Sequence, residues 1–225
     1  MKRSDAARQT FNIIPANELT KKAAIHEAGH AAAIYLGNKR KQLPPVFFQI
    51  CMDNAIIEAN TFYDKYPARI EGGRLIHTLP CSIEEATSNF SPTQKHAYQQ
   101  AFEADIINLL AGSLAEAHYV ALRDNELINP RLVSFNTLHN YGGFFDLSII
   151  QDYLACFSDN VIQREAKIKE LFLAAFHFVS DYANWKAITT LATYILAQSK
   201  SVIDCEEVIT VLDTTLQRLT LHEVI

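Results

Sequence analysis

Apolar residues recur at helical spacing, every three or four positions, along most of this 225-residue chain. Only 7 glycines and 7 prolines interrupt the pattern, and no repeat, low-complexity tract or linker-like run marks a domain boundary. We therefore predict a single, mainly helical domain, and the hydrophobic share of 49% is sufficient for a sizeable core. The predicted helices cover approximately residues 17–36, 91–123, 146–157, 161–181, 185–198 and 204–219.

Local signals indicate the limits of two of these helices. Asn17 is a typical N-cap for the first helix, and Gly37 is a typical residue at which it would stop. Ser91 as cap and Pro92 in the first turn predict the start of the long second helix.

Two segments lack the helical pattern. Residues 44–52 contain a short β-prone apolar run after a proline pair, and residues 74–79 follow Gly72-Gly73. Each predicts a short strand. The predicted fold class is mainly α with a small β-sheet.

Charge and composition exclude several classes of protein. Lys plus Arg number 20 against 25 Asp plus Glu, a formal charge of -5, so the chain lacks the basic field that holds a nucleic-acid backbone. Its apolar runs fall short of the roughly 20 residues that cross a bilayer, and its first residues lack the apolar core of a signal peptide. The four cysteines stand far apart and form no Cys-x-x-Cys pair. We therefore expect a cytoplasmic protein with reduced thiols and no membrane span.

Residues 26–30 read His-Glu-Ala-Gly-His inside the first predicted helix. Positions i and i+4 share a helix face, so His26 and His30 can present ring nitrogens to one zinc ion at about 2.0 to 2.1 Å. Glu27 points about 100° around the helix, where it can act as general base on a metal-bound water. Gly29 stands among alanines, and this run of small side chains lets another backbone approach closely. The alternative is an ordinary helix face with both histidines hydrogen-bonded in the core.

Two histidines leave zinc short of protein ligands, because catalytic sites usually have three and keep a further position for water. The His-x-x-Gly-x-x-His extension of one zincin class is absent, since Ala33 and Leu36 occupy its Gly and His positions. The third ligand must therefore come from a later helix. The candidates are the acids Glu103, Asp105, Glu116, Asp146 and Asp152.

The motif and three later segments resemble the peptidase domain of the FtsH family of ATP-dependent zinc metalloproteases. Residues 24–31 resemble the zinc motif of that family, and residues 110–116 resemble its Gly-Arg-Ala-Ala-Glu helix. Residues 145–147 resemble the Asn-Asp-Leu segment that supplies its aspartate ligand. Residues 47–52 resemble its strand beside the active site, and the likeness extends over about residues 19–219.

The resemblance implies an FtsH-type zinc metallopeptidase domain that stands alone, without the family's ATPase module and membrane anchor. It implies that Glu27 activates water and that Glu116 fixes the orientation of a histidine. The residues that would bind zinc are His26, His30 and Asp146. For Asp146 the alternative role is that of a helix N-cap after the Gly142-Gly143 pair.

The single domain would span residues 1–225. An N-terminal extension would cover residues 1–16. The active-site helix, the small sheet and the long helix would follow in residues 17–143. The C-terminal helices, with the third ligand, would occupy residues 144–225.

We expect the protein to hydrolyse peptide bonds in unfolded or short polypeptides. No Gly-x-x-x-x-Gly-Lys-Ser/Thr phosphate loop occurs in the sequence, so hydrolysis would be independent of ATP or driven by a separate ATPase partner. Surface aromatic residues of the C-terminal helices would favour a homo-oligomer. An extended peptide substrate would add to a free strand edge, formed by Val46, Phe47, Phe48, Gln49 and Ile50.

Two further hypotheses remain open from the sequence. A non-catalytic module would keep the fold and the metal but bind a protein partner, although it would have no chemical need for Glu27. A metalloprotease of another His-Glu-x-x-His class would take Glu103 or Glu116 as third ligand. Further polar candidates, whose ordinary role is structural, are His118, His139 and Tyr141.

Overall fold

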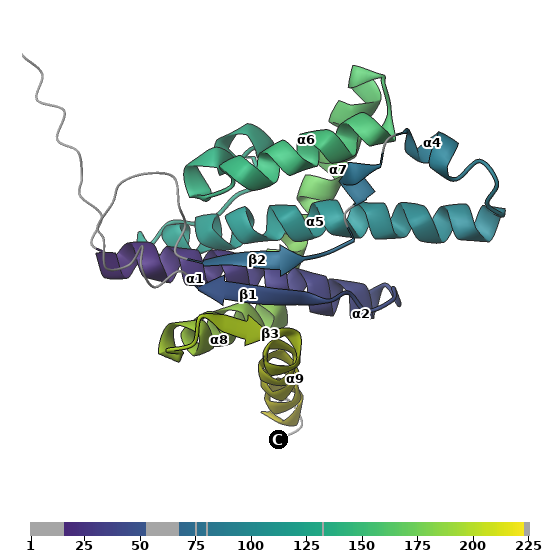
Figure 1. The fold of residues 1–225 in the computed structure, drawn as a ribbon. Coiled ribbons are helices and arrows are strands. Elements are labelled where there is room, and N and C mark those ends of the chain that lie inside the picture. Colours follow the sequence, from purple (N-terminus) through teal and green to yellow (C-terminus); the bar gives the residue numbers. More distant parts are fainter. Residues whose placement is uncertain (1–15, 53–67, 75, 80, 132, 223–225) are drawn as a thin grey trace, which may run out of the picture.

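A computed structural model of the chain describes residues 16–52, 68–74, 76–79, 81–131 and 133–222. This part is mainly helical and contains one antiparallel sheet of three strands (Figure 1). The helices are α1 (Ala16–Ala32), α2 (Asn38–Arg40), α4 (Ile83–Ala86), α5 (Pro92–Arg123), α6 (Phe144–Phe157), α7 (Val161–Ser180), α8 (Tyr182–Ala197) and α9 (Cys205–His222). The strands are β1 (Phe48–Met52), β2 (Ala68–Gly72) and β3 (Val202–Asp204).

The long helix α5 has the limits that its sequence predicts. The Ser91 side chain accepts a hydrogen bond from the Gln94 backbone N–H, and the Ser91 N–H donates to the Gln94 side chain. Pro92 is the first helical residue, where its missing N–H has no cost. The helices α6 to α9 also lie where the apolar spacing predicts them.

The predicted limits of the first helix are wrong at both ends. Asn17 already lies inside α1, which includes Ala16. Gly37 has right-handed helical angles, and the helix continues through a π-helical turn (Ala33–Gly37) into α2. A glycine stops a helix only where it adopts a left-handed conformation, and Gly37 does not.

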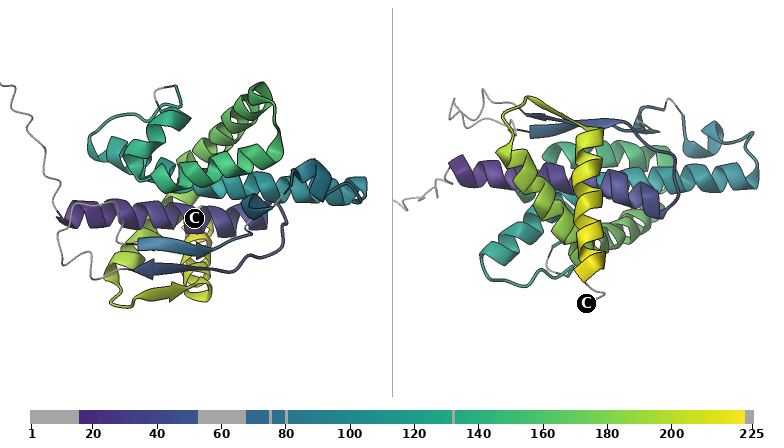
Figure 2. Two further views of the ribbon diagram at one scale, coloured as in Figure 1. Left: turned by 45° about the horizontal axis from the view of Figure 1, so that its top comes forward. Right: turned by 90° about the horizontal axis from the view of Figure 1, so that it is seen from below.

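Helices α1 and α5 run antiparallel and pack against each other in the middle of the domain (Figures 1 and 2). Gly29 permits this close approach. A Cβ atom at its position would lie 2.7 Å from the Ala111 backbone oxygen and 2.7 Å from the Ala115 Cβ. Both distances are well inside the contact distance of about 3.5 Å. The small residues around Gly29 predict the close approach of another backbone, and helix α5 is that backbone.

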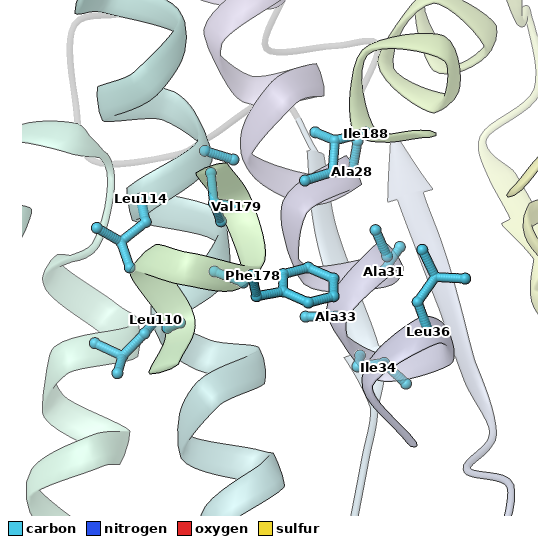
Figure 3. Packing of buried hydrophobic residues seen from close by; sticks show 14 of the residues in the cluster. Ala28, Ala31, Ala33, Ile34, Leu36, Leu110, Leu114, Phe178, Val179 and Ile188 are labelled. Atoms are coloured by element: carbon cyan, nitrogen blue, oxygen red, sulfur yellow. The ribbon is translucent and has the colours of Figure 1, made fainter. Parts of the chain in front are cut away.

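The core that holds the motif helix in place comes from α5, α7 and α8. Figure 3 shows Phe178 pointing from α7 toward Ala33, and Ile188 facing Ala28 where α8 crosses α1. Ala28, Ala33 and Ile188 are all completely buried. Burial of one large apolar side chain contributes about 1.5 to 3 kcal/mol, so contacts of this kind fix the position of α1.

The sheet has the strand order β2-β1-β3, and both pairings are antiparallel. The second strand ends at Gly72 instead of following the Gly72-Gly73 pair, so the prediction of a strand at 74–79 is wrong. Residues Ile76–Thr78 form a 3₁₀ turn instead. Gly72 has a φ of 116°, and a Cβ there would lie 2.8 Å from the Phe48 Cα, so the chain can leave the strand here only as glycine. The three-residue strand β3 is too short to give a sequence pattern.

The predicted docking strand does not present a free edge. Phe48–Met52 pairs with β2 on one side, and Gln49–Cys51 pairs with β3 on the other. Both edges of β1 are therefore occupied, so the prediction of a free strand edge there is wrong. Of the predicted docking residues Val46, Phe47, Phe48, Gln49 and Ile50, Val46 precedes β1 and lines the cavity described below. Among the described strands, the unpaired edge beside the cavity described below belongs to β2.

The remaining predictions from composition have mixed outcomes. The four cysteines carry free thiols. No helix in the described ranges combines the length and the apolar character of a membrane span. Phe172, Phe176 and Phe178 belong to the core, whereas Tyr182 is 72% exposed, and homo-oligomer formation stays a prediction.

Candidate metal centre

Three sequence-predicted ligands meet at one point although they come from distant parts of the chain. His26 and His30 lie one turn apart on the buried face of α1. Asp146 lies in the first turn of α6, whose N-cap is Gly143, so the alternative of Asp146 as the cap is wrong. The two imidazole rings are 4.7 Å apart between centroids, at an interplanar angle of 74°.

The spacing of the three ligand atoms suits a tetrahedral metal ion. Asp146 Oδ2 lies 3.1 Å from His26 Nε2 and 3.3 Å from His30 Nε2. Two atoms that each bind zinc at about 2.0 to 2.1 Å in a tetrahedron are about 3.3 to 3.4 Å apart. All three candidate ligand atoms lie within 4.8 Å of one another. These residues can therefore hold a metal ion, and two imidazoles with one carboxylate are a donor set that zinc accepts.

The other nitrogen of each imidazole is held by helix α5. His30 Nδ1 lies 2.7 Å from the Asn108 backbone oxygen, to which it can donate. His26 Nδ1 lies 3.4 Å from Glu116 Oε2, a position that suits the orienting role that the resemblance implies for Glu116. With Nδ1 beside these oxygens, each ring turns Nε2 toward Asp146. Contacts of this kind on the second ring nitrogen are the usual outer support of metal-binding histidines.

Electrostatics favour a positive charge at the centre of the cluster. Burial lowers the pKa of each imidazole, but Asp146, with Glu116 for His26, outweighs burial and raises the pKa of both rings. Burial raises the Asp146 pKa, but the two imidazoles outweigh it and leave the pKa below its usual value. Carboxylates thus surround a buried space, and protonated imidazole rings or a cation must balance their negative charge. A divalent metal ion provides that charge without protons.

Glu27 stands beside the cluster and lines the same cavity. It is only 4% exposed. Burial is the main cause that raises the Glu27 pKa to about 7, against the opposing effects of His26, His30 and a hydrogen bond from the Ile70 backbone. A carboxyl group that titrates near neutrality can both accept and release a proton, which is the requirement for a general acid–base.

A cavity of about 560 Å³ lies over the cluster, within the size range of small-molecule pockets. Its walls come from α1, α5, α6, β2 and the segment that follows β2. Apolar side chains form much of its surface, among them Ile34, Leu109 and Ile149. A second polar group, distinct from the metal ligands, also lines it and contains Arg74, His77, Asp105 and Tyr153.

The other candidates for the third ligand have different partners. Glu103 accepts hydrogen bonds from Lys167 and Gln99. Asp105 pairs with Arg74, with Arg74 Nη1 2.6 Å from the carboxylate. Asp152 lies exposed on α6. The geometry therefore favours Asp146 over these three and over Glu116, which faces the opposite nitrogen of His26.

The remaining polar candidates lie away from the cluster or pack structurally. His118 stacks on Trp185 with 4.3 Å between ring centroids, and burial lowers its pKa. His139 is exposed. Tyr141 packs against the core.

Sequence reasoning missed two residues that shape the site. Asn108 orients His30 through its backbone oxygen, which no side-chain pattern reveals. Gly112 leaves room for the His30 ring, because a Cβ at this position would overlap it. The signal for Gly112 was present, since a glycine inside a long helix usually has a packing reason.

No protein-family model matches the chain, and no curated protein matches it. The fold and the site therefore define only a mainly helical protein with a candidate centre for a metal ion.

Proposed function

We propose that the chain is a cytoplasmic zinc metallopeptidase with an FtsH-type fold, which hydrolyses unfolded or short polypeptides without ATP. One observation supports this proposal above the others. The His26–His30–Asp146 cluster and the buried carboxyl of Glu27 line one cavity, next to a strand whose outer edge is unpaired in the described structure. Metal ligands, a proton acceptor and a place for an extended chain are the parts that peptide hydrolysis requires.

Each residue of the site has a role in this proposal. When bound, zinc supplies the Lewis acidity that activates a water molecule and polarises the scissile carbonyl. Glu27 accepts the proton from the attacking water and passes it to the leaving amine. Asn108 and Glu116 keep the imidazoles in the orientation that binds metal. The zinc ligands are His26, His30 and Asp146.

The outer edge of β2 supports binding of an extended peptide. The Gly73 N–H donates to the Phe47 carbonyl, and hydrogen-bonded pairs alternate along an antiparallel ladder. The backbone groups of Ile70, three residues before Gly73, consequently point away from β1, and Ile70 and Glu27 line the same cavity. A peptide that adds to this edge would pass directly beside the proton acceptor.

In the FtsH family, which the sequence resembles, an ATPase module unfolds the substrates. The sequence holds no phosphate loop, so in this proposal the substrates are already unfolded or short, or a separate ATPase delivers them. A homo-oligomer remains compatible with the proposal.

The test combines metal analysis with cleavage of unfolded casein. We expect about one zinc per chain and cleavage that Glu27→Gln reduces by at least about a hundredfold, the scale of lost general-base catalysis. The variant should retain zinc, because Glu27 is not a ligand. Glu165→Gln is the matched control, since it makes the same change at an exposed position of α7 and should leave cleavage unchanged.

Two outcomes would contradict the proposal. Equal cleavage by wild type and Glu27→Gln would identify the activity as a contaminant. Bound zinc without cleavage of casein or of short peptides would favour the non-catalytic module that binds a protein partner.

A further inference from the structure

The second polar group in the cavity lies next to the metal centre along α5. Asp105 precedes Asn108, whose carbonyl orients His30, by three residues, which is about 4.5 Å along the helix axis. Arg74 approaches Asp105 from the segment after β2, and Tyr153 approaches it from α6. Arg74, Asp105 and Tyr153 line the cavity beside the metal ligands and are not part of the ligand set.

Asp105 is an anchor in this group. Its Oδ1 accepts a hydrogen bond from Arg74 Nη1 at 2.6 Å, and its Oδ2 accepts one from the Tyr153 hydroxyl at 3.0 Å. Asp105 is 6% exposed. Both of its oxygens are therefore engaged and enclosed, so Asp105 fixes the guanidinium and is not itself a receptor for a ligand.

Arg74 retains donors that the described structure does not use. A guanidinium has five N–H groups, and those of Arg74 bond only Asp105 and the Pro44 carbonyl among the described residues. Its side chain is 14% exposed and lines the cavity. His77 stands beside it, with its ring 5.0 Å from the Tyr153 ring, and its buried Nδ1 has no partner in the described ranges.

The groups that remain available to a ligand are thus chiefly the N–H donors of the Arg74 guanidinium cation. A guanidinium held in place by a buried carboxylate matches the flat, two-oxygen geometry of another carboxylate. A lysine side chain of the substrate would be repelled by the positive charge of Arg74. An apolar side chain would remove water from the free N–H groups without replacing it, which costs binding free energy. The apolar wall formed by Leu109 and Ile149 can contact the aliphatic part of a longer acidic residue.

We propose that Arg74, positioned by Asp105 and assisted by His77, forms a subsite that binds the carboxylate of a glutamate or aspartate near the scissile bond of the substrate. This inference rests on the proposed peptidase function, because it names the class of peptide that the same site takes. Arg74 and His77 contact the substrate, and Asp105 acts through Arg74.

The test measures peptide binding in the zinc-loaded Glu27→Gln variant, which holds substrate without cleaving it. Fluorescent peptides carry a single Glu, Gln, Leu or Lys, scanned through each position of a neutral sequence, and anisotropy gives the Kd. At one position we expect Glu to bind at least about tenfold tighter than Gln or Leu, a difference of about 1.4 kcal/mol. Added Arg74→Gln should abolish the preference, Arg74→Lys should leave part of it, and His77→Ala should weaken it.

Arg69→Gln is the matched control. Arg69 also lines the cavity and loses the same charge, but its side chain is 64% exposed and pairs with Glu71. It should leave the preference for Glu intact. Circular dichroism and zinc content establish that each variant is folded, and the His77→Ala and Arg74→Lys arms decide the question if Arg74→Gln does not fold.

The outcomes separate this inference from the proposed function. Equal Kd values for Glu and Leu peptides at every position, or a loss of preference in Arg69→Gln as large as in Arg74→Gln, would overturn the subsite. Cleavage of casein by the wild type would stand in that case. A preference for Glu that depends on Arg74, in a protein whose wild type cleaves nothing, would support the subsite and contradict the peptidase.

Discussion

Replacing Gly112 with alanine should weaken zinc binding strongly without unfolding the protein. A Cβ atom at this position would lie 2.7 Å or closer to three atoms of the His30 ring, of which Cδ2 is the farthest. Atoms in contact stand about 3.5 Å apart, so the ring must retreat by at least about 0.8 Å. The backbone of α5 does not have to change, because alanine is the best helix former.

This retreat is large on the scale of metal coordination. Ligand distances tolerate about 0.2 Å, and His30 would also lose its 2.7 Å contact with the Asn108 carbonyl. Loss of one such orienting partner costs about 10- to 100-fold in metal affinity. Since Gly112→Ala moves the ligand itself, we expect the Kd for zinc to rise at least about a hundredfold.

The assay is a competition titration with a chromogenic zinc chelator, with circular dichroism to verify the helical content. Gly37→Ala is the matched control, because the nearest atom to a Cβ there is Asn108 Oδ1 at 3.9 Å and the backbone is right-handed helical. It should bind zinc normally and gain up to about 1 kcal/mol of stability. A folded Gly112→Ala protein with wild-type zinc affinity would refute the placement of His30 against α5.

Three further predictions concern the same centre. Asp146→Asn should raise the Kd for zinc at least about a hundredfold because it removes a ligand, whereas Asp152→Asn on the exposed face of α6 should not change it; equal affinities in the chelator titration would exclude Asp146 as ligand. In metal-free protein, the folded state raises the Glu27 pKa from 4.5 to about 7, so the unfolded state releases this proton first and stability falls as pH rises through that window. Glu27→Gln should then be more stable than wild type by up to about 3 kcal/mol above pH 8 and equal to it below pH 4, and urea titrations that show no such pH dependence would contradict the burial of an ionisable Glu27. Zinc added at about 100 times its Kd should stabilise the wild type by about 2.7 kcal/mol, as a higher melting temperature that excess chelator reverses; a similar shift in Asp146→Asn would place the ion elsewhere.

The local features of this protein followed from the sequence. His26 and His30 share a helix face because four residues make about one turn, and no distant contact is needed for that. The capping residues Ser91 and Pro92 predicted the start of α5, and the alanines around Gly29 predicted a closely packed neighbour. These signals are reliable because each depends on residues within one or two helical turns.

Other features required the tertiary structure. The contact between His26 and Asp146 joins residues 120 positions apart, and several acids on later helices were equally available from the sequence without the resemblance. The free edge of the sheet was predicted on the wrong strand, because β3 pairs with β1 from about 150 residues further along the chain. The pairing of Arg74 with Asp105 likewise depends on how the segment after β2 approaches α5.

The sequence by itself determined a mainly helical chain with an imidazole pair and an adjacent carboxylate on one helix. Only the tertiary structure decided which acid completes the cluster, which strand edge lies beside it and which cationic side chain lines the same cavity. The physical reason is that helix periodicity and capping act over a few residues, whereas the close packing of α1 against α5 and the position of α6 arise from burial summed over the whole core.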